Sequence, residues 1–157
     1  MLGHMVHDPD GLEGTPGSTR GLSLLPVDTK LAAPKTTTIA KFQWGESSGT
    51  GYEIHMGRTE LFGGGPLFKV TELNGKAHES ADGCISEDKR VIGAYMHGLF
   101  DSPEILSRWL SHIGVRGVNI SEAHGIVARD SQYDLLAAHF EKHINVDGLM
   151  ELFLPTR

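Results

Sequence analysis

The chain has 157 residues, of which 39% are hydrophobic and 22% are charged, so it is long enough for one domain with a buried core. Its formal net charge is −6 and it contains no basic block, which argues against nucleic acid as a partner. No apolar run approaches the roughly 20 residues needed to cross a bilayer, no signal-peptide pattern opens the chain, and the single cysteine excludes an internal disulfide framework, so we expect a cytoplasmic protein that does not bind membranes.

The part of the chain before residue 101 is rich in glycine and in short apolar runs, which predicts strands and turns. Residues 1–6 are apolar and open without a cap, so we interpret them as the tail of a helix. Asn74-Gly75 has the composition of a hairpin turn. We expect a polar loop at 76–89, and strands at 21–27, 36–44, 52–56, 67–73 and 91–96.

The remaining third of the chain has the apolar spacing of helices. Ser102 and Pro103 are a typical N-cap and first-turn residue, and Gly114 is a typical terminator. We therefore predict one helix between them, a second at about 129–144 and a short third at about 146–153. We expect each of the three to bury an apolar face.

His97 is the leading candidate for a catalytic residue. It follows the apolar strand predicted at 91–96 and precedes Gly98, so it lies where a strand becomes a turn. Enzymes with α/β folds often carry reactive side chains at such places, and an imidazole can exchange protons near neutral pH. The alternative is a histidine at the edge of the core that bonds to backbone, and position alone does not decide between the two.

Residues 51–57 read GYEIHMG and form the second candidate site. Strand alternation puts Glu53 and His55 on one face, where a carboxylate and an imidazole lie side by side. We take Tyr52, Glu53 and His55 as candidate residues lining a substrate-binding site. A half-solvated strand face is the simpler interpretation of the same pattern.

Three other features carry no site in our interpretation. Cys84 lies between Asp82 and Glu87 without a nearby base or cation, so its thiol lacks the surroundings that activate a nucleophile. His4 and His7 have no third ligand at a convincing spacing, and we expect no metal. The glycines at 63–65 lack the Lys-Ser/Thr pair and the helix of a phosphate-binding loop.

The motifs together resemble one family, the C-terminal glutamine amidotransferase domain of cobyric acid synthases. The resemblance rests on MLG at 1–3, DP at 8–9, EG at 13–14, GLSLLPVDT at 21–29, GYEIHMG at 51–57 and GAYMHGLFD at 93–101. Arg129 and the run LLA at 135–137 extend it toward the end of the chain. It covers nearly all of the sequence, and the two longer motifs are specific in combination.

The resemblance implies a three-layer α/β fold of the class I glutamine amidotransferase (flavodoxin-like) type. It implies that a cysteine hydrolyses glutamine through a glutamyl thioester, with His97 as the catalytic histidine. The ammonia would serve an ATP-dependent synthetase domain that amidates adenosylcobyrinic acid a,c-diamide in cobalamin biosynthesis. ATP and magnesium belong to that domain, so we expect no cofactor in this chain. Leu99 occupies the position of the usual orienting glutamate, which implies a Cys/His dyad.

The family's nucleophile lies on a Gly-Cys-Gly-Gly elbow just before the segment that matches residues 1–3. We therefore expect residues 1–157 to be the C-terminal part of an amidotransferase domain, incomplete at its N-terminus, and inactive alone. Its expected partners are glutamine and an upstream synthetase domain, in the same chain or a separate one. The alternative is a noncatalytic docking module, or one half of a split enzyme completed in trans.

Overall fold

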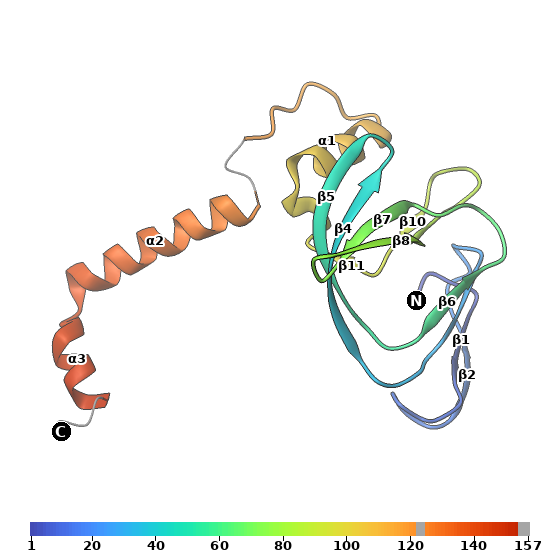
Figure 1. Ribbon diagram of the computed structural model, residues 1–157, viewed down its shortest axis with the longest axis horizontal. Helices are drawn as coiled ribbons and strands as arrows, with labels where there is room; N and C mark the ends of the chain where they lie inside the picture. Colours follow the sequence, from blue (N-terminus) through green and yellow to red (C-terminus); the bar gives the residue numbers. More distant parts are fainter. Residues whose placement is uncertain (122–124, 154–157) are drawn as a thin grey trace. The chain divides into compact units, whose positions relative to one another are not determined.

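The computed structural model describes residues 1–121 and 125–153, and the chain divides into two compact units, 1–118 and 119–157. The first unit contains three β-sheets and the helix α1 (Figure 1). The predicted α/β class is confirmed in its coarse sense, because strands in several sheets are combined with a few helices.

The largest sheet has the strand order β11-β5-β4-β7-β8, and every neighbouring pair in it is antiparallel. Its strands are β4 (Thr36–Trp44), β5 (Ser47–His55), β7 (Phe68–Leu73), β8 (Lys76–Asp82) and β11 (Met96–His97). The strand predicted at 36–44 is confirmed at the same residues. Ala40, Phe42 and Trp44 are buried while the residues between them are exposed, as strand alternation requires.

The main core lies on the buried face of this sheet. Phe42 packs against Phe68 with ring centroids 4.8 Å apart, and Val70 and Met96 belong to the same cluster. The helix α1 (Pro103–His112) contributes Ile105, which is fully buried. The one apolar face predicted for this helix therefore packs on the sheet that carries β11.

A second sheet has the order β2-β1-β3-β6. It consists of β1 (Met5–Asp8), β2 (Gly17–Arg20), β3 (Val27–Lys30) and β6 (Arg58–Leu61). The pair β1–β3 is parallel, and the other two pairs are antiparallel. A third, two-stranded sheet pairs β9 (Cys84–Ile85) with β10 (Ile92–Gly93).

Two predictions for the N-terminal part are wrong. Residues 1–6 are not the tail of a helix, because β1 pairs with β2 on one side and β3 on the other. The strand expected at 21–27 is irregular up to Val27, with Ser23 at a φ of 54°. Its backbone instead makes single bonds to the first residues of the chain, such as Leu22 N to Met1 O at 3.0 Å. Pairing between distant segments overrides local preference here.

Two predictions around residues 76–96 also need correction. The polar stretch at 76–89 is not all loop, since β8 forms a hairpin with β7. Most of β8 is exposed on both faces, so it has no hydrophobic alternation to detect. The turn between these strands is the predicted Asn74-Gly75, with φ values of 49° and 77°. The strand expected at 91–96 is divided into β10 and β11, which pair with different partners.

The helical predictions agree closely with the structure. After the short 3-10 helix η1 (Leu99–Asp101), α1 ends at His112, and Gly114 follows with a φ of 80°. The second unit contains α2 (Ile126–His143) and α3 (Val146–Phe153), near the predicted ranges. The burial expected for their apolar faces is not observed, because Tyr133, Leu136, Phe140, Leu149, Leu152 and Phe153 are exposed. Within the described residues, none of the helices is both long and apolar enough to cross a membrane.

Candidate functional site

His97 lies at the end of the two-residue strand β11, where the chain turns into η1 and α1. The strand pairs with the middle of β5, with Met96 opposite Glu53 and His97 opposite Tyr52. Met96 is buried, while His97 is exposed. Gly98 follows with a φ of 71°, a left-handed conformation that favours glycine. The backbone therefore holds the imidazole at a strand end open to solvent, as the sequence predicted.

Tyr52 is the aromatic neighbour of His97. The two rings are stacked, with centroids 5.1 Å apart and an angle of 11° between their planes. Since the two residues face each other across paired strands, the contact follows directly from the register. The candidate residue Tyr52 is thus beside the candidate residue His97.

The turn after His97 is fastened to β5 by the start of α1. Ser102 occupies the N-cap position but makes no side-chain capping bond. Its Oγ instead accepts a hydrogen bond from the Thr50 N–H at 3.2 Å, and Glu104 Oε2 accepts one from Ser48 N–H at 3.1 Å. The capping role expected for the Ser102 side chain is therefore replaced by a bond between helix and strand.

Glu53 and His55 lie together, as strand alternation predicted, but on the other face of β5 from Tyr52. Glu53 pairs with the buried Met96 and belongs to that inner side. Glu53 Oε2 and His55 Nδ1 are 3.8 Å apart, and the His55 ring stacks on Tyr95 with centroids 4.6 Å apart. The structure brings Tyr52 to His97 and groups Glu53 with His55 elsewhere.

Asp82, at the end of β8, interacts electrostatically with Glu53 and His55, and these three residues form what we call the inner cluster. Burial raises the pKa of Glu53, the Asp82 carboxylate raises it further, and His55 opposes the change. Burial also raises the pKa of Asp82, against a backbone hydrogen bond from Gly83 and the influence of His55. His55 Nδ1 and Asp82 Oδ2 are buried and have no hydrogen-bond partner among the described residues. The inner cluster therefore contains two carboxyl groups and an imidazole, and one atom of Asp82 and one of His55 lack a hydrogen bond to the described residues.

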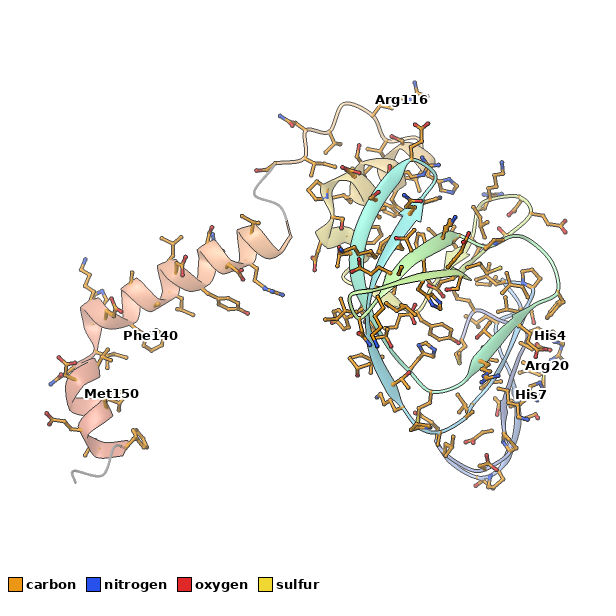
Figure 2. All side chains as sticks on the ribbon, in the orientation of Figure 1. His4, His7, Arg20, Arg116, Phe140 and Met150 are labelled. Carbon is orange, nitrogen blue, oxygen red and sulfur yellow. The ribbon has the colours of Figure 1, made fainter. Side chains whose placement is uncertain are left out.

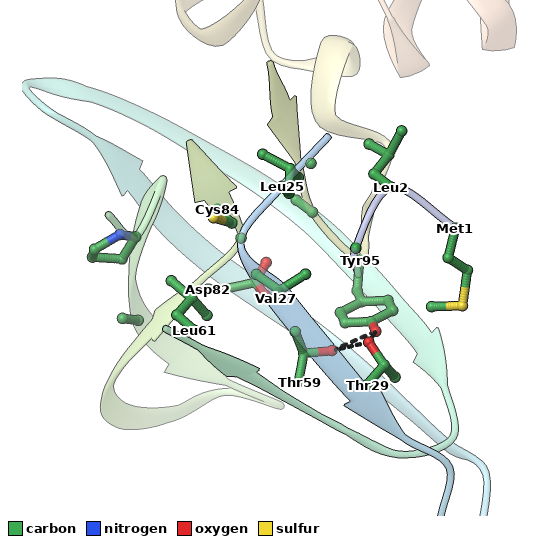
Figure 3. Close-up of a pocket in the computed structure, with 16 residues that line it drawn as sticks. Met1, Leu2, Leu25, Val27, Thr29, Thr59, Leu61, Asp82, Cys84 and Tyr95 are labelled. Carbon is green, nitrogen blue, oxygen red and sulfur yellow. Dashed lines mark hydrogen bonds between the residues drawn. The ribbon is translucent and has the colours of Figure 1, made fainter. Parts of the chain in front are cut away.

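A cavity of about 250 Å³ lies next to the inner cluster (Figure 3). Its wall is mostly apolar and includes Met1, Leu2 and Leu25, with Asp82 at one side. Three hydroxyl groups close a triangle in the wall. Tyr95 Oη lies 2.6 Å from Thr59 Oγ1 and 3.2 Å from Thr29 Oγ1, and the two threonine hydroxyls are 2.8 Å apart. This triangle connects β3, β6 and the segment before β11.

Cys84 lines the same cavity and is 3% exposed. Burial raises the pKa of its thiol, which disfavours the thiolate that a nucleophile needs. The environment supports the interpretation of Cys84 as a structural residue.

His4 and His7 face separate partners rather than a common ligand. His4 Nδ1 is 3.5 Å from Asp28 Oδ1, and His7 Nδ1 is 2.8 Å from Ser18 Oγ. Both lie at the β1 side of the first unit (Figure 2). Within residues 1–121 and 125–153, no three His, Cys, Asp or Glu side chains are grouped so that they could hold a metal ion.

Comparison with known proteins identifies the family of the chain. Residues 1–105 match the CobB/CobQ-like glutamine amidotransferase domain. The chain belongs to this amidotransferase family. The match includes Tyr52, Glu53, His55 and His97, and so both faces of β5 and the end of β11.

Curated relatives extend the similarity over nearly the whole chain. A cobyric acid synthase from Paracoccus denitrificans is 41% identical over 154 residues, and one from Chlorobium phaeobacteroides (strain DSM 266) is 39% identical over 155. One from Chlorobaculum tepidum is 38% identical over 160 residues. Each alignment covers 97% of this chain but only 30% of the relative. This amidotransferase-family chain thus spans about a third of the length of the synthases it matches.

The sequence alone does not indicate that Asp82 and Tyr95 are neighbours of Glu53 and His55, or that Thr29 and Thr59 bond to Tyr95. Tyr95 belongs to the motif at 93–101, but nothing in its spacing indicates a partner on β3 or β6. Asp82 belongs to the polar stretch that we expect to be a loop, and side-chain direction cannot be inferred for a loop. Their proximity arises from the packing of segments that are far apart in the chain.

Proposed function

We propose that the chain is the glutaminase part of a cobyric acid synthase, which supplies ammonia from glutamine for an ATP-dependent amidation in cobalamin biosynthesis. Membership of the amidotransferase family and the cobyric acid synthase relatives support this proposal. The observation that carries it is the position of His97, exposed at the end of a paired strand and stacked on Tyr52.

His97 acts in this proposal as a general base and then a general acid. Its imidazole takes the proton of a cysteine thiol, whose sulfur attacks the side-chain carbonyl carbon of glutamine. The same imidazole returns the proton to the departing ammonia, and water then hydrolyses the glutamyl thioester. An exposed imidazole at a strand end is suited to this exchange because both the thiol and the substrate can reach it.

The nucleophile comes, in this proposal, from a segment that precedes the matched residues in the longer synthases. Cys84 is a poor alternative since it is buried, and burial raises the pKa of its thiol. Residues 1–157 would then be the C-terminal part of one amidotransferase domain with the three-layer class I fold. The match of residues 1–105 to the amidotransferase family supports this. ATP and magnesium would be used by the synthetase region only.

A chimaera tests the proposal. In the cobyric acid synthase of Chlorobaculum tepidum, this chain replaces the matched 30%. Amidation of adenosylcobyrinic acid a,c-diamide is then measured with glutamine and, separately, with ammonium as nitrogen donor. We expect activity with both donors. His97→Ala should reduce the glutamine-dependent rate by roughly 100-fold or more, because proton transfer of this kind contributes at least that much.

The ammonium-dependent rate is the control for folding, since external ammonia bypasses glutamine hydrolysis. His78→Ala is a matched control, because His78 is exposed on β8 in the same unit. A His97→Ala chimaera that uses glutamine at the unsubstituted rate would overturn the proposal. An unsubstituted chimaera that uses ammonium but not glutamine would instead support the noncatalytic docking module.

A further inference from the structure

We infer that Tyr52 is a positioning residue that holds the imidazole of His97 in one orientation. The inference rests on the proposed function, because only an imidazole with a catalytic task needs a fixed direction. It also gives Tyr52 a role different from lining the substrate site. The supporting observation is the stacked contact between the two rings, 5.1 Å apart and 11° from parallel.

Among residues 1–121 and 125–153, the stacked Tyr52 ring is the one aromatic contact of the His97 side chain. His97 is exposed, its strand has only two residues, and the following Gly98 begins a turn. An exposed side chain on so short an element samples several rotamers unless a neighbour favours one. An aromatic pair in contact shifts such an equilibrium by roughly two- to tenfold. The Tyr52 ring is therefore the feature that selects one imidazole rotamer.

The backbone brings the two rings to this distance. β5 and β11 approach each other closely at Gly51, where an added Cβ would lie 2.6 Å from His97 O and 2.7 Å from Met96 Sδ. Tyr52 is the next residue on β5 and directly opposite His97. Because the contact is between ring faces, it needs the aromatic ring of Tyr52 and does not need its hydroxyl group.

The inner face of β5 offers a comparison within the same strands. There, Glu53 lies opposite Met96, and His55 stacks on Tyr95 rather than on His97. Glu53 and His55 are on the side of β5 away from the Tyr52 ring that contacts His97. Orientation of His97 therefore depends on Tyr52 and not on Glu53, although a carboxylate is the more familiar partner of a catalytic imidazole.

NMR of the full 157-residue chain tests the contact directly. We expect ring-proton signals of His97 shifted upfield by the Tyr52 ring, and couplings that indicate one predominant His97 rotamer. Tyr52→Phe should keep both features, and Tyr52→Leu should lose both. Ile54→Leu is the matched control, because Ile54 lies on the same face of β5 and is similarly exposed. Unchanged His97 signals in Tyr52→Leu would overturn the inference.

The chimaera described above tests what the contact does. Tyr52→Leu should lower kcat for glutamine-dependent amidation by roughly two- to tenfold with KM for glutamine unchanged, and Tyr52→Phe should restore kcat. A change in KM alone would make Tyr52 a substrate-binding residue and would contradict the inference. Full glutamine-dependent activity in His97→Ala would overturn the proposed function. The NMR experiment tests the ring contact separately, because it does not depend on catalytic activity.

Discussion

The close approach of β5 and β11 at Gly51 makes Gly51→Ala an informative substitution. The new methyl group would lie 2.6 Å from His97 O, 2.7 Å from Met96 Sδ and 2.8 Å from Met96 Cγ. The first contact is with backbone, which cannot rotate away as a side chain does. β11 must therefore move outward by several tenths of an ångström, which separates the His97 and Tyr52 rings and disturbs Met96 in the core.

The expected cost is that of overpacking a well-packed site, about 1–3 kcal/mol. Gly17→Ala is the matched control. Gly17 is also a strand residue, on β2, and the nearest atom to its added Cβ is 3.9 Å away. Both substitutions reduce backbone freedom in the unfolded chain equally, so this contribution cancels between them. We expect Gly51→Ala to be less stable than Gly17→Ala by about 1–3 kcal/mol.

Urea unfolding followed by tryptophan fluorescence measures this difference. Trp44 reports on the correct unit, since it is 8% exposed and belongs to the same core cluster as Met96. In parallel, the NMR signals of His97 should lose part of their upfield shift in Gly51→Ala and keep it in Gly17→Ala. Equal unfolding midpoints for the two variants, with unchanged His97 signals, would refute the close approach of the strands.

Three further predictions concern the inner face and the cavity. Tyr95→Phe should lower the free energy of unfolding by about 1–2 kcal/mol, because it removes the hydroxyl group that bonds to Thr29 and Thr59. Tyr133→Phe is the control, since Tyr133 is exposed, and it should not change the free energy of unfolding measurably in the same urea experiment. The pKa of Asp82 is higher in the folded than in the unfolded protein, so the free energy of unfolding should fall as pH rises from about pH 4 and Asp82 ionises. Asp82→Asn should therefore be more stable than the unsubstituted protein at pH 7 and should lose this pH dependence. If the unsubstituted protein instead gains stability relative to Asp82→Asn as pH rises, the argument is wrong. Cys84→Ala should change the rate of glutamine-dependent amidation by the chimaera by no more than about twofold. The Cys84 thiol of the folded protein should react with a maleimide far more slowly than the thiol of the protein unfolded in urea. Loss of the glutamine-dependent rate in Cys84→Ala, with normal use of ammonium, would instead identify Cys84 as the nucleophile.

Local signals in the sequence were sufficient for several elements near the site. Pro103 in the first turn and Gly114 after the last turn marked the bounds of α1, because such signals depend on a few neighbouring residues, although the Ser102 side chain at the N-cap bonds to Thr50 N–H and does not cap the helix. Asn74-Gly75 indicated its hairpin because both residues tolerate positive φ. The sequence also predicted His97 at a strand end, because the apolar residues before it and Gly98 after it are its neighbours in the chain.

Local signals failed where pairing between distant segments decided the structure. Residues 5–8 form β1 because β2 and β3 supply partners, although the apolar composition of residues 1–6 suggested the tail of a helix. β8 is a strand through its hairpin with β7, and its exposed side chains show no alternation. The segment 91–96 was expected as one strand, but its two ends pair with different sheets.

The sequence by itself determined the family, the chain-order motifs and the position of His97, because these depend on residue identity and near neighbours. It also determined that Glu53 and His55 share a face, since alternation is a property of a single strand. Only the tertiary structure decided that Tyr52 is the neighbour of His97, and that Asp82 and Tyr95 are the neighbours of Glu53 and His55. For Tyr52 and His97 the physical reason is register: which residues of two strands face each other depends on hydrogen bonds and packing between segments more than 40 residues apart, about which neither segment alone carries information. Asp82 approaches Glu53 and His55 from β8, which is separated from β5 by two strands, so packing of the whole sheet decides its position.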